Sequence, residues 1–347
     1  MSDMTMQAPG FAKGPLLEVR DLSVHFPTPD GVVKAVDGVS FSIERGQTLG
    51  VVGESGSGKS VTFLTVMGLI TKKMATVEGE VIFKGQDLLQ LPPEEMRHIR
   101  GDQMGMVFQD PMTSLHPMFK VGSQIVEAIR AHRKIPKDEA RDQAVELLRR
   151  VGIPQPQERA RQYPHEFSGG MRQRAMIAMA LALDPDLLIA DEPTTALDVT
   201  VQAQILELID RLKEEFNAAV VIITHDLGVV AEHCNDILVM YAGRPAEYGA
   251  RSDIYYGSHH PYTWGLLQSI TRIDRPRTER LHPIRGSPPS LIFVPPGCPF
   301  HPRCPYVMDV CREEIPEMLP HDGRHSAACH LPLSEKERIF KEEVVAT

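Results

Sequence analysis

The sequence predicts an α/β protein with a parallel sheet at its centre, and three observations support this fold class. Residues 53–60 read GESGSGKS and fit the pattern G-x-x-x-x-G-K-[ST]. A short apolar run, 48–52, precedes this loop, and residues 61–69 can continue as a helix after it. Two later apolar runs, 187–190 and 218–223, end in polar residues, as is typical of parallel strands that are covered on both faces.

The glycine-rich loop predicts a site for nucleotide phosphates. Its glycines let backbone N–H groups turn toward phosphate oxygens, and the start of the following helix adds positive potential. Lys59 is expected to reach the β- and γ-phosphates, and the Ser60 hydroxyl is expected to bind Mg²⁺. A chance glycine-rich turn is the alternative interpretation of the loop alone. The predicted phosphate contacts are Gly53, Ser55, Gly56, Gly58, Lys59 and Ser60.

Length and charge limit the class of protein. A chain of 347 residues is long enough for one large domain and a smaller one. Its 46 acidic and 37 basic residues leave a net charge of −9, which argues against a protein that coats nucleic acid. No stretch approaches the ~18 uninterrupted apolar residues of a membrane span, and the N-terminus lacks a signal-peptide pattern. We therefore expect a disordered leader over residues 1–15 and a cytosolic chain that reaches a membrane through a partner protein.

Apolar residues alternate along 17–26 and again along 39–43, with the turn signal Pro-Asp-Gly between them. This pattern predicts antiparallel strands. Phe26 ends the first strand, where its ring could stack on a purine base near the phosphate loop. An ordinary core phenylalanine is an equally good interpretation of its position.

Gln109 follows a second strand-like piece, 103–108, which itself comes after another at 80–83. This glutamine could ligate Mg²⁺ or position a water molecule, and the proline-containing loop behind it could move with a neighbouring protein. A plain turn residue is the better interpretation of the residue alone. Residues 123–183 are predicted to be mostly helical.

Ser168, Gly169 and Gly170 stand before a predicted helix over 175–183. They form a second anion-binding shape, because free backbone N–H groups and the positive end of the helix dipole meet there. A helix cap is the alternative. Two phosphate sites in one nucleotide domain would be redundant unless the second serves a nucleotide that another subunit holds.

Two adjacent carboxylates, Asp191 and Glu192, end the apolar run 187–190. Asp191 is expected to hold Mg²⁺, and Glu192 to orient or activate the attacking water. A solvated turn is the alternative, but the position directly after a buried strand in a chain with a phosphate loop favours the functional interpretation.

Asp198 and His225 follow in two further loops. Asp198 precedes an amphipathic helix predicted over 201–216, and His225 comes directly after the apolar run 218–223. His225 could contact the γ-phosphate at this end of the sheet, or it could be a polar loop histidine.

The last fifth of the chain is rich in proline and cysteine. Ten of the 28 prolines lie within 283–320, so neither a regular helix nor a central strand is expected there. In a cytosolic protein a cysteine cluster favours a metal site over disulfides or free thiols, because a bound ion can order a segment that lacks a core of its own. Zinc sites usually show C-x2-C pairs, which this segment lacks. The four cysteines are Cys298, Cys304, Cys311 and Cys329.

Together and in this order, the motifs resemble those of the ATPase subunits of ABC transporters, in particular the oligopeptide/dipeptide importer branch. The resemblance runs from Leu17 to about Leu331 and includes the tail segment around Cys298 and Cys304. The segment around Ser168-Gly169-Gly170 corresponds to the signature motif of this family, which most often reads Leu-Ser-Gly-Gly-Gln. It departs from that form by having Phe167 and Met171, while its glycines are unchanged. The matching motifs are the phosphate loop, Gln109, Ser168-Gly169-Gly170, the pair Asp191-Glu192, Asp198 and His225.

The resemblance implies a P-loop ABC-type ATPase core with an antiparallel β-subdomain and a helical subdomain, plus an irregular Cys-rich C-terminal extension. The implied ATPase domain covers 16–255, with the helical subdomain at about 110–183. The extension covers 256–335, and a tail covers 336–347.

The resemblance also assigns roles within a head-to-tail dimer, in which each ATP lies between the phosphate loop of one subunit and the signature of the other. It implies nucleotide contacts from Ser168, Gly169, Gly170 and Asp198, and it places Phe26 where an adenine-stacking aromatic residue, more often tyrosine, is found. The implied catalytic residues are Lys59, Gln109, Glu192 and His225. The implied Mg²⁺ ligands are Ser60, Gln109 and Asp191. For the tail, a [4Fe–4S] cluster held by the four cysteines is implied, and all-thiolate ligation is consistent with it.

The predicted function is ATP hydrolysis that powers import of oligopeptides or dipeptides. The implied partners are a second, different ATPase subunit, two membrane-spanning permease subunits and an extracytoplasmic peptide-binding protein, with no nucleic acid. The chain is expected peripherally at the cytoplasmic face of the inner membrane. Import of another small solute such as nickel or glutathione is one alternative. A soluble ABC ATPase without a transport role is another, but tandem ATPase halves, a coiled coil or a basic surface would favour it, and the sequence has none of these.

Overall fold

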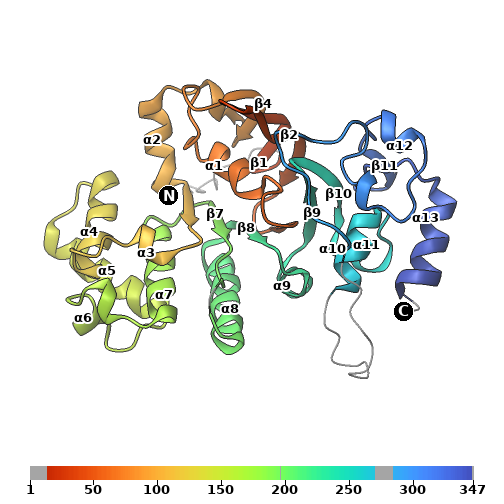
Figure 1. Ribbon diagram of the computed structural model, residues 1–347. Helices are drawn as coiled ribbons and strands as arrows, with labels where there is room; N and C mark the ends of the chain where they lie inside the picture. The colour runs from red at the N-terminus through yellow and green to blue at the C-terminus, as the bar shows by residue number, and fades with distance from the viewer. Residues whose placement is uncertain (1–13, 196, 270–283, 346–347) are drawn as a thin grey trace, which may run out of the picture.

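The computed structural model describes residues 14–195, 197–269 and 284–345. Most of the predicted leader, residues 1–13, and the last two residues of the predicted tail lie outside the described residues. The described chain contains an eight-stranded sheet, a four-stranded sheet, a helical region and the C-terminal extension (Figure 1). The α/β class predicted from the sequence is confirmed.

The eight-stranded sheet has a parallel centre and an antiparallel edge. The five strands from β9 to β6 run parallel to one another, and the three before them run antiparallel to their neighbours. In spatial order the strands are β11 (Leu319–Asp322), β12 (His325–Ala327), β10 (Arg244–Ala250), β9 (Asp236–Tyr241), β3 (Thr48–Val52), β8 (Ala219–Thr224), β7 (Leu187–Asp191) and β6 (Met104–Val107).

The central strands are buried on both faces because alternate residues enter two different hydrophobic cores. In β7, Leu187 and Ile189 pack on the side of the four-stranded sheet and α1 (Lys59–Val66). Leu188 and Ala190 pack on the opposite side, with the helical region and α8 (Val199–Phe216). This two-sided burial is the reason that the sequence reads as uninterrupted apolar runs here.

The four-stranded sheet is antiparallel and has the order β2-β1-β4-β5. The predicted alternation in β1 is confirmed, since Leu17, Val19, Leu22 and Val24 are all buried. The pairing of β1 shifts register between Val19 and Leu22, which explains the slip in the alternation at that point. The strands are β1 (Leu17–Thr28), β2 (Gly31–Ile43), β4 (Thr76–Phe83) and β5 (Gln86–Asp87).

The helical region projects to one side of the sheets, coloured yellow to light green in Figure 1. Its longest helices, α4, α5 and α7, pack against one another, and α7 also packs against β6 before the chain enters β7. Helix α7 begins earlier than predicted, at Gly169, because Ser168 caps it. The helices here are α3 (Pro111–Ser114), α4 (Val121–His132), α5 (Lys137–Arg150), α6 (Pro156–Arg159), η2 (Pro164–Glu166) and α7 (Gly169–Ala180), and η1 (Leu88–Gln90) and α2 (Pro93–Asp102) precede them.

Two helices connect the later strands of the central sheet. Helix α8 (Val199–Phe216) leads into β8, and α9 (Leu227–His233) lies between β8 and β9. Helix α8 is amphipathic and buries Ile205, Leu208 and Leu212 against the core. Within the three ranges that the structure covers, no helix has both the length and the apolar character needed to cross a membrane.

The C-terminal extension is less irregular than predicted. The hairpin β11-β12 adds to the edge of the central sheet through β10, so the prediction is wrong for this part. The physical reason is that β10 would otherwise expose unpaired backbone groups, and Pro320 is tolerated because β11 is the outer strand. Residues 284–300 do form turns and irregular chain. The helices are α10 (Arg251–Tyr256), α11 (Pro261–Gln268), η3 (His301–Arg303), α12 (Val310–Glu313), α13 (Leu333–Ile339) and the π-helical η4 (Phe340–Val345).

Candidate active site

The phosphate loop joins the end of β3 to the start of α1, as predicted. Two of its glycines are required by the backbone. Gly53 and Gly58 have φ values of +155° and +98°, which side-chain-bearing residues rarely adopt. A Cβ atom at Gly53 would lie 2.2 Å from the Met240 carbonyl oxygen, and one at Gly58 would lie 2.2 Å from that of Ala35. The loop is therefore wedged between neighbouring backbone segments.

Lys59 is folded onto the loop that precedes it. Its ammonium nitrogen donates hydrogen bonds to the carbonyl oxygens of Gly53 at 2.7 Å and Glu54 at 2.9 Å. Burial lowers the pKa of Lys59, and the nearby carboxylates of Glu192 and Asp191 oppose that effect. The third N–H of the ammonium group has a long contact of 3.4 Å to the Ser57 hydroxyl and can turn toward a phosphate.

Ser60 and Asp191 bring two oxygen donors together beside the loop. The Ser60 hydroxyl donates to Asp191 Oδ1 at 3.0 Å. Burial raises the pKa of Asp191, and the hydrogen bond from Ser60 only partly offsets this. A hydroxyl and a buried carboxylate are hard oxygen ligands of the kind that Mg²⁺ prefers, so these two residues fit the predicted ion.

Glu192 lies at the centre of a hydrogen-bonded group. Its carboxylate accepts from Gln109 Nε2 at 2.8 Å and from Thr195 Oγ1 at 2.8 Å, and His225 Nδ1 lies 3.3 Å away. Burial acts to raise the pKa of Glu192, but the bonds from Thr195 and His225 outweigh it, so the pKa is lowered. The carboxylate is thus held ionised, as a base must be.

The backbone of Glu192 is in the left-handed region, with φ of +46°. This conformation is strained for a residue with a side chain and is common at functional sites. The Glu192 N–H donates to the Ile223 carbonyl oxygen at 2.9 Å, which ties the end of β7 to β8. This hydrogen bond and the turn together fix the backbone from which the Glu192 side chain extends.

A cavity of about 600 Å³ joins the phosphate loop to this group. Three residues predicted from separate motifs, Gln109, Glu192 and His225, line it together. The extension also contributes to the lining, which the sequence analysis did not anticipate. The complete lining is Gly53, Glu54, Ser55, Gln109, Glu192, His225, Leu266, Ser269 and Ile284.

Thr195 is a site residue that the sequence analysis missed. Its hydroxyl contacts the Glu192 carboxylate and contributes to lowering the pKa of that group. The sequence signal for this role is a hydroxyl-bearing residue three positions after Glu192, close enough in the chain to contact its carboxylate.

The signature residues and Asp198 are not brought to this cavity. The Ser168 hydroxyl accepts from the Met171 N–H at 3.3 Å and caps α7, while Asp198 accepts from the Val201 N–H at 3.0 Å and caps α8. The alternative interpretation of Ser168 as a helix cap therefore describes its contacts within this chain. Phe26 lies in β1, opposite Val33 of β2, and packs half-buried against the core.

The four cysteines of the extension are reduced. Cys298 and Cys311 are buried, and Cys304 and Cys329 are half-buried. Burial raises the pKa of Cys298 to about 11 and that of Cys304 to about 12, with smaller contributions from the neighbouring thiols. In the part of the chain that the structure describes, no group of three or more His, Cys, Asp or Glu side chains is placed to hold a metal ion. The structure thus does not support the predicted cluster, because the four thiols are not grouped as a set of metal ligands.

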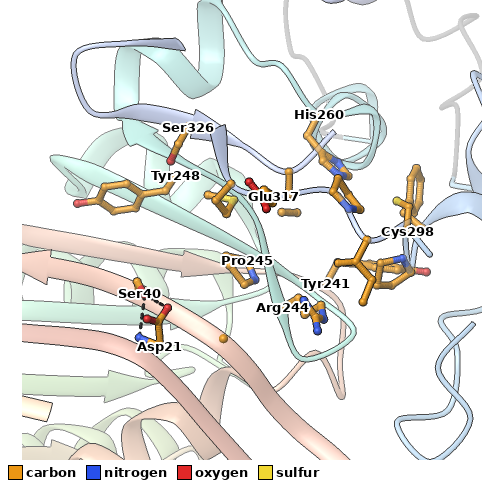
Figure 2. Close-up of a pocket in the computed structure, with 18 residues that line it drawn as sticks. Asp21, Ser40, Tyr241, Arg244, Pro245, Tyr248, His260, Cys298, Glu317 and Ser326 are labelled. Carbon is orange, nitrogen blue, oxygen red and sulfur yellow. Dashed lines mark hydrogen bonds between the residues drawn. The ribbon is translucent and has the colours of Figure 1, made fainter. Parts of the chain in front are cut away.

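A second cavity, of about 370 Å³, separates the four-stranded sheet from the extension (Figure 2). Figure 2 shows Asp21 and Ser40 on the sheet side, joined by hydrogen bonds, and His260 and Cys298 on the extension side. Arg244, which also lines the cavity, donates to Asp37 at 2.6 Å. None of the predicted nucleotide residues lines this cavity.

Comparison with known proteins agrees with this geometry. Residues 36–195 match the family described as ABC transporter, and residues 246–311 match the family described as oligopeptide/dipeptide transporter, C-terminal region. The chain is similar in fold to the ATP-binding cassette MJ0796, solved as a dimer in a post-hydrolysis state bound to ADP and Pi. That match has a TM-score of 0.62 at 28% identity and covers 68% of this chain and 98% of the other.

Two curated relatives match over nearly their full length. One is the oligopeptide transport ATP-binding protein OppD of Salmonella typhimurium, 51% identical over 96% of this chain and 99% of the relative. Another is the dipeptide transport ATP-binding protein DppD of Bacillus subtilis, 52% identical over 91% of this chain and 94% of the relative. On these matches, and with the ATPase cassette fold described above, the chain belongs to the family of ATP-binding subunits of oligopeptide/dipeptide ABC transporters.

Proposed function

We propose that this chain hydrolyses ATP to power the import of oligopeptides or dipeptides through a membrane ABC transporter. The observation that carries the proposal is the Glu192 carboxylate, held by Gln109 and Thr195 in the same cavity as the phosphate loop. A positioned base next to a phosphate loop is the arrangement that hydrolysis of a phosphoanhydride requires. The names of the relatives supply the transported class.

In the proposed reaction the residues of the site act on the γ-phosphate and a water molecule. Glu192 orients the water and accepts its proton while the water oxygen forms a bond to the γ-phosphorus. The bond between that phosphorus and the bridging oxygen of ADP breaks in line, and ADP departs with the electron pair. Lys59 stabilises the negative charge on the phosphates, and His225 contacts the γ-phosphate.

Ser60, Asp191 and Gln109 are the proposed ligands of Mg²⁺. When bound, this ion would neutralise negative charge on the phosphates. The contact between Ser60 and Asp191 supports this assignment, because it brings a hydroxyl and a carboxylate to one point beside the loop. Phe26, in β1 of the four-stranded sheet, is proposed to stack on the adenine.

Ser168, Gly169, Gly170 and Asp198 are proposed to serve a nucleotide bound by a second ATPase subunit, of a different type. Two observations support this division. These residues do not line the cavity of their own chain, and Ser168 opens a 12-residue helix whose first N–H groups can bind an anion.

The remaining assignments follow the family. We propose two membrane-spanning permease subunits and an extracytoplasmic peptide-binding protein as partners, and a peripheral location at the cytoplasmic face of the inner membrane. The proposed organisation is an ATPase domain over 16–255 with the helical subdomain at about 110–183, an extension over 256–335 and a tail over 336–347.

A [4Fe–4S] cluster held by Cys298, Cys304, Cys311 and Cys329 is a separate proposal. It is supported by the sequence resemblance and by one contact between two of the cysteines, since the Cys298 N–H donates to the Cys311 carbonyl oxygen at 2.9 Å. An absorption spectrum of anaerobically purified protein tests it, together with iron, sulfide and zinc analysis. A broad band near ~400 nm with iron and sulfide is expected. Stoichiometric zinc, or a folded protein without metal, would overturn it.

The transport function is tested with the assembled transporter. The chain is co-purified with its permease and ATPase partners, reconstituted in proteoliposomes and supplied with the peptide-binding protein. We expect uptake of a labelled oligopeptide or dipeptide to require ATP and to stop in the E192Q variant. ATP-dependent uptake of nickel or glutathione, without peptide uptake, would reassign the solute. Absence of ATP hydrolysis in the wild type would refute the function.

A further inference from the structure

We propose that Arg303, in the C-terminal extension, is a positioning residue for the phosphate loop. It holds and neutralises Glu54, the second residue of the loop, so that the extension sets the affinity for MgATP. This inference rests on the proposed ATP site and adds to it a residue that lies outside the ATPase motifs.

The guanidinium group of Arg303 makes a two-pronged contact with the Glu54 carboxylate. One terminal nitrogen donates to Oε2 at 2.5 Å and the other to Oε1 at 2.9 Å. The Arg303 side chain is only 5% exposed, and that of Glu54 is 26% exposed. Two parallel hydrogen bonds between a guanidinium and a carboxylate fix direction as well as distance, and poor access of water strengthens them.

Other contacts hold Arg303 itself in place. Its Nε donates to the Arg285 carbonyl oxygen at 2.9 Å, and its terminal nitrogens reach the Gly286 carbonyl oxygen and the Tyr241 hydroxyl, each at 3.3 Å. Because all three nitrogens are engaged, the guanidinium has one orientation. Arg303 can therefore transmit the position of the extension to Glu54.

The backbone of Glu54 is held as well. Its N–H donates to the hydroxyl of the fully buried Tyr262, in α11, at 2.8 Å. Its carbonyl oxygen accepts from Lys59. Glu54 is thus fixed at its side chain, its N–H and its carbonyl group, and two of these three contacts come from the extension. A loop that is already fixed loses less conformational freedom when it closes around phosphates.

The contact between Arg303 and Glu54 also changes the net charge beside the phosphate loop. The cavity beside the loop is lined by Glu54 and Glu192, and Asp191 lies next to Ser60. A triphosphate in this cavity would be repelled by an uncompensated carboxylate on the loop. Arg303 cancels that charge without entering the cavity.

The test is an equilibrium titration of the full-length chain with a fluorescent ATP analogue in the presence of Mg²⁺, with ATP as competitor. We expect R303M to raise the Kd for MgATP by about tenfold or more, since it leaves Glu54 unpaired beside the phosphates. The matched control is R324M. Arg324 contacts Asp236 of β9 at 3.2 Å and so also joins the extension to the core sheet, but away from the phosphate loop. The Kd of R324M for MgATP is expected to stay within about twofold of the wild-type value.

Two more variants separate charge from position. The double variant E54Q/R303M has no unpaired carboxylate on the loop, but it still lacks the contact that holds the loop to Arg303. We therefore expect a Kd between those of R303M and wild type. R303K keeps the charge but cannot make the two-pronged contact, and a several-fold increase in Kd is expected; this variant also decides the question if R303M fails to fold by circular dichroism.

Three outcomes would overturn the inference. They are an unchanged Kd in folded R303M, an equal loss in R324M, and a wild-type Kd in both R303K and the double variant. A wild-type chain that binds no nucleotide would instead refute the proposed function on which the inference rests.

Discussion

Gln109 Nε2 donates a 2.8 Å hydrogen bond to Glu192 Oε2, although the two residues are 83 positions apart in the chain. Gln109 follows β6 and Glu192 follows β7, and these two parallel strands are neighbours in the sheet. The carboxyl ends of adjacent parallel strands meet at one edge, so residues from separate motifs share one site. This relationship links the glutamine of a loop that leads into the helical region to the base proposed for hydrolysis.

Replacing Glu192 by glutamine should abolish turnover without abolishing binding. The amide keeps the shape of the side chain but cannot accept a proton from water, so we expect kcat for ATP hydrolysis to fall by about 10²–10⁴-fold. Steady-state hydrolysis by the assembled transporter and nucleotide titration measure the two effects. The control is E214Q, on α8 and outside the cavity lining. A variant E192Q that retains more than about a tenth of the turnover would exclude Glu192 as the base.

Replacing Thr195 by valine should move the acid limb of the pH–rate profile. The Thr195 hydroxyl helps to lower the pKa of Glu192, and valine removes that hydrogen bond while keeping the branched shape. The pKa of Glu192 then rises, and because the base works in its ionised form, activity is lost at a higher pH than in the wild type. The measurement is kcat for ATP hydrolysis as a function of pH. T195S, which keeps the hydroxyl, should leave the limb in place, and a T195V profile that overlays the wild type would contradict this role.

Replacing Glu247 by alanine should strongly destabilise the fold. Glu247, in β10, is fully buried and accepts hydrogen bonds from Ser258 Oγ and His325 Nε2, each at 2.8 Å. Removing one partner of a buried pair leaves the others unsatisfied, so we expect a loss of about 3–5 kcal/mol in the free energy of unfolding. Urea denaturation measures it. The control is E342A, an exposed partner of Arg338, with an expected loss below about 1 kcal/mol.

Because the Glu247 carboxylate is buried and hydrogen-bonded, we expect the stability of the fold to depend on pH. Burial acts to raise the pKa of Glu247, but the hydrogen bond from His325 and its neighbours lower it below the ordinary value of 4.5. The stabilisation by the carboxylate is therefore complete above the unfolded-state pKa and is lost as the pH falls through the lower folded-state value. The difference in unfolding free energy between wild type and E247A should narrow as the pH is lowered below 4.5. If the difference in unfolding free energy between wild type and E247A does not change with pH, the charge of the Glu247 carboxylate does not contribute to stability.

Replacing Gly58 by alanine should damage the phosphate loop more than the same change at Gly56. Both glycines have positive φ, +98° and +76°, so both variants incur a strain of about 1–2 kcal/mol. Only the Cβ at position 58 meets backbone, at 2.2 Å from the Ala35 carbonyl oxygen, while the space around position 56 is open. We expect G58A to bind nucleotide about tenfold or more weakly than G56A. Equal affinities in a titration would show that the close approach to Ala35 does not set the loop.

Local patterns in the sequence determined the phosphate loop, the buried strands and the order of the motifs. The phosphate loop places its glycines, Lys59 and Ser60 within eight consecutive residues. The uninterrupted apolar runs of β7 and β8 predict that these strands are buried on both faces. These features depend on contacts between near neighbours or on the average environment of a strand. For this reason the fold class and most of the site residues could be predicted.

Only the tertiary structure decided how distant segments meet. It placed Gln109 beside Glu192, added the hairpin β11-β12 to the edge of the central sheet, and brought Arg303 to Glu54 across 249 positions. Neither the loop that contains Gln109 nor the proline-rich segment carries a local signal for these contacts. They depend on which sheet edge lacks a backbone partner and on which buried charge needs neutralising, and both are properties of the folded chain as a whole.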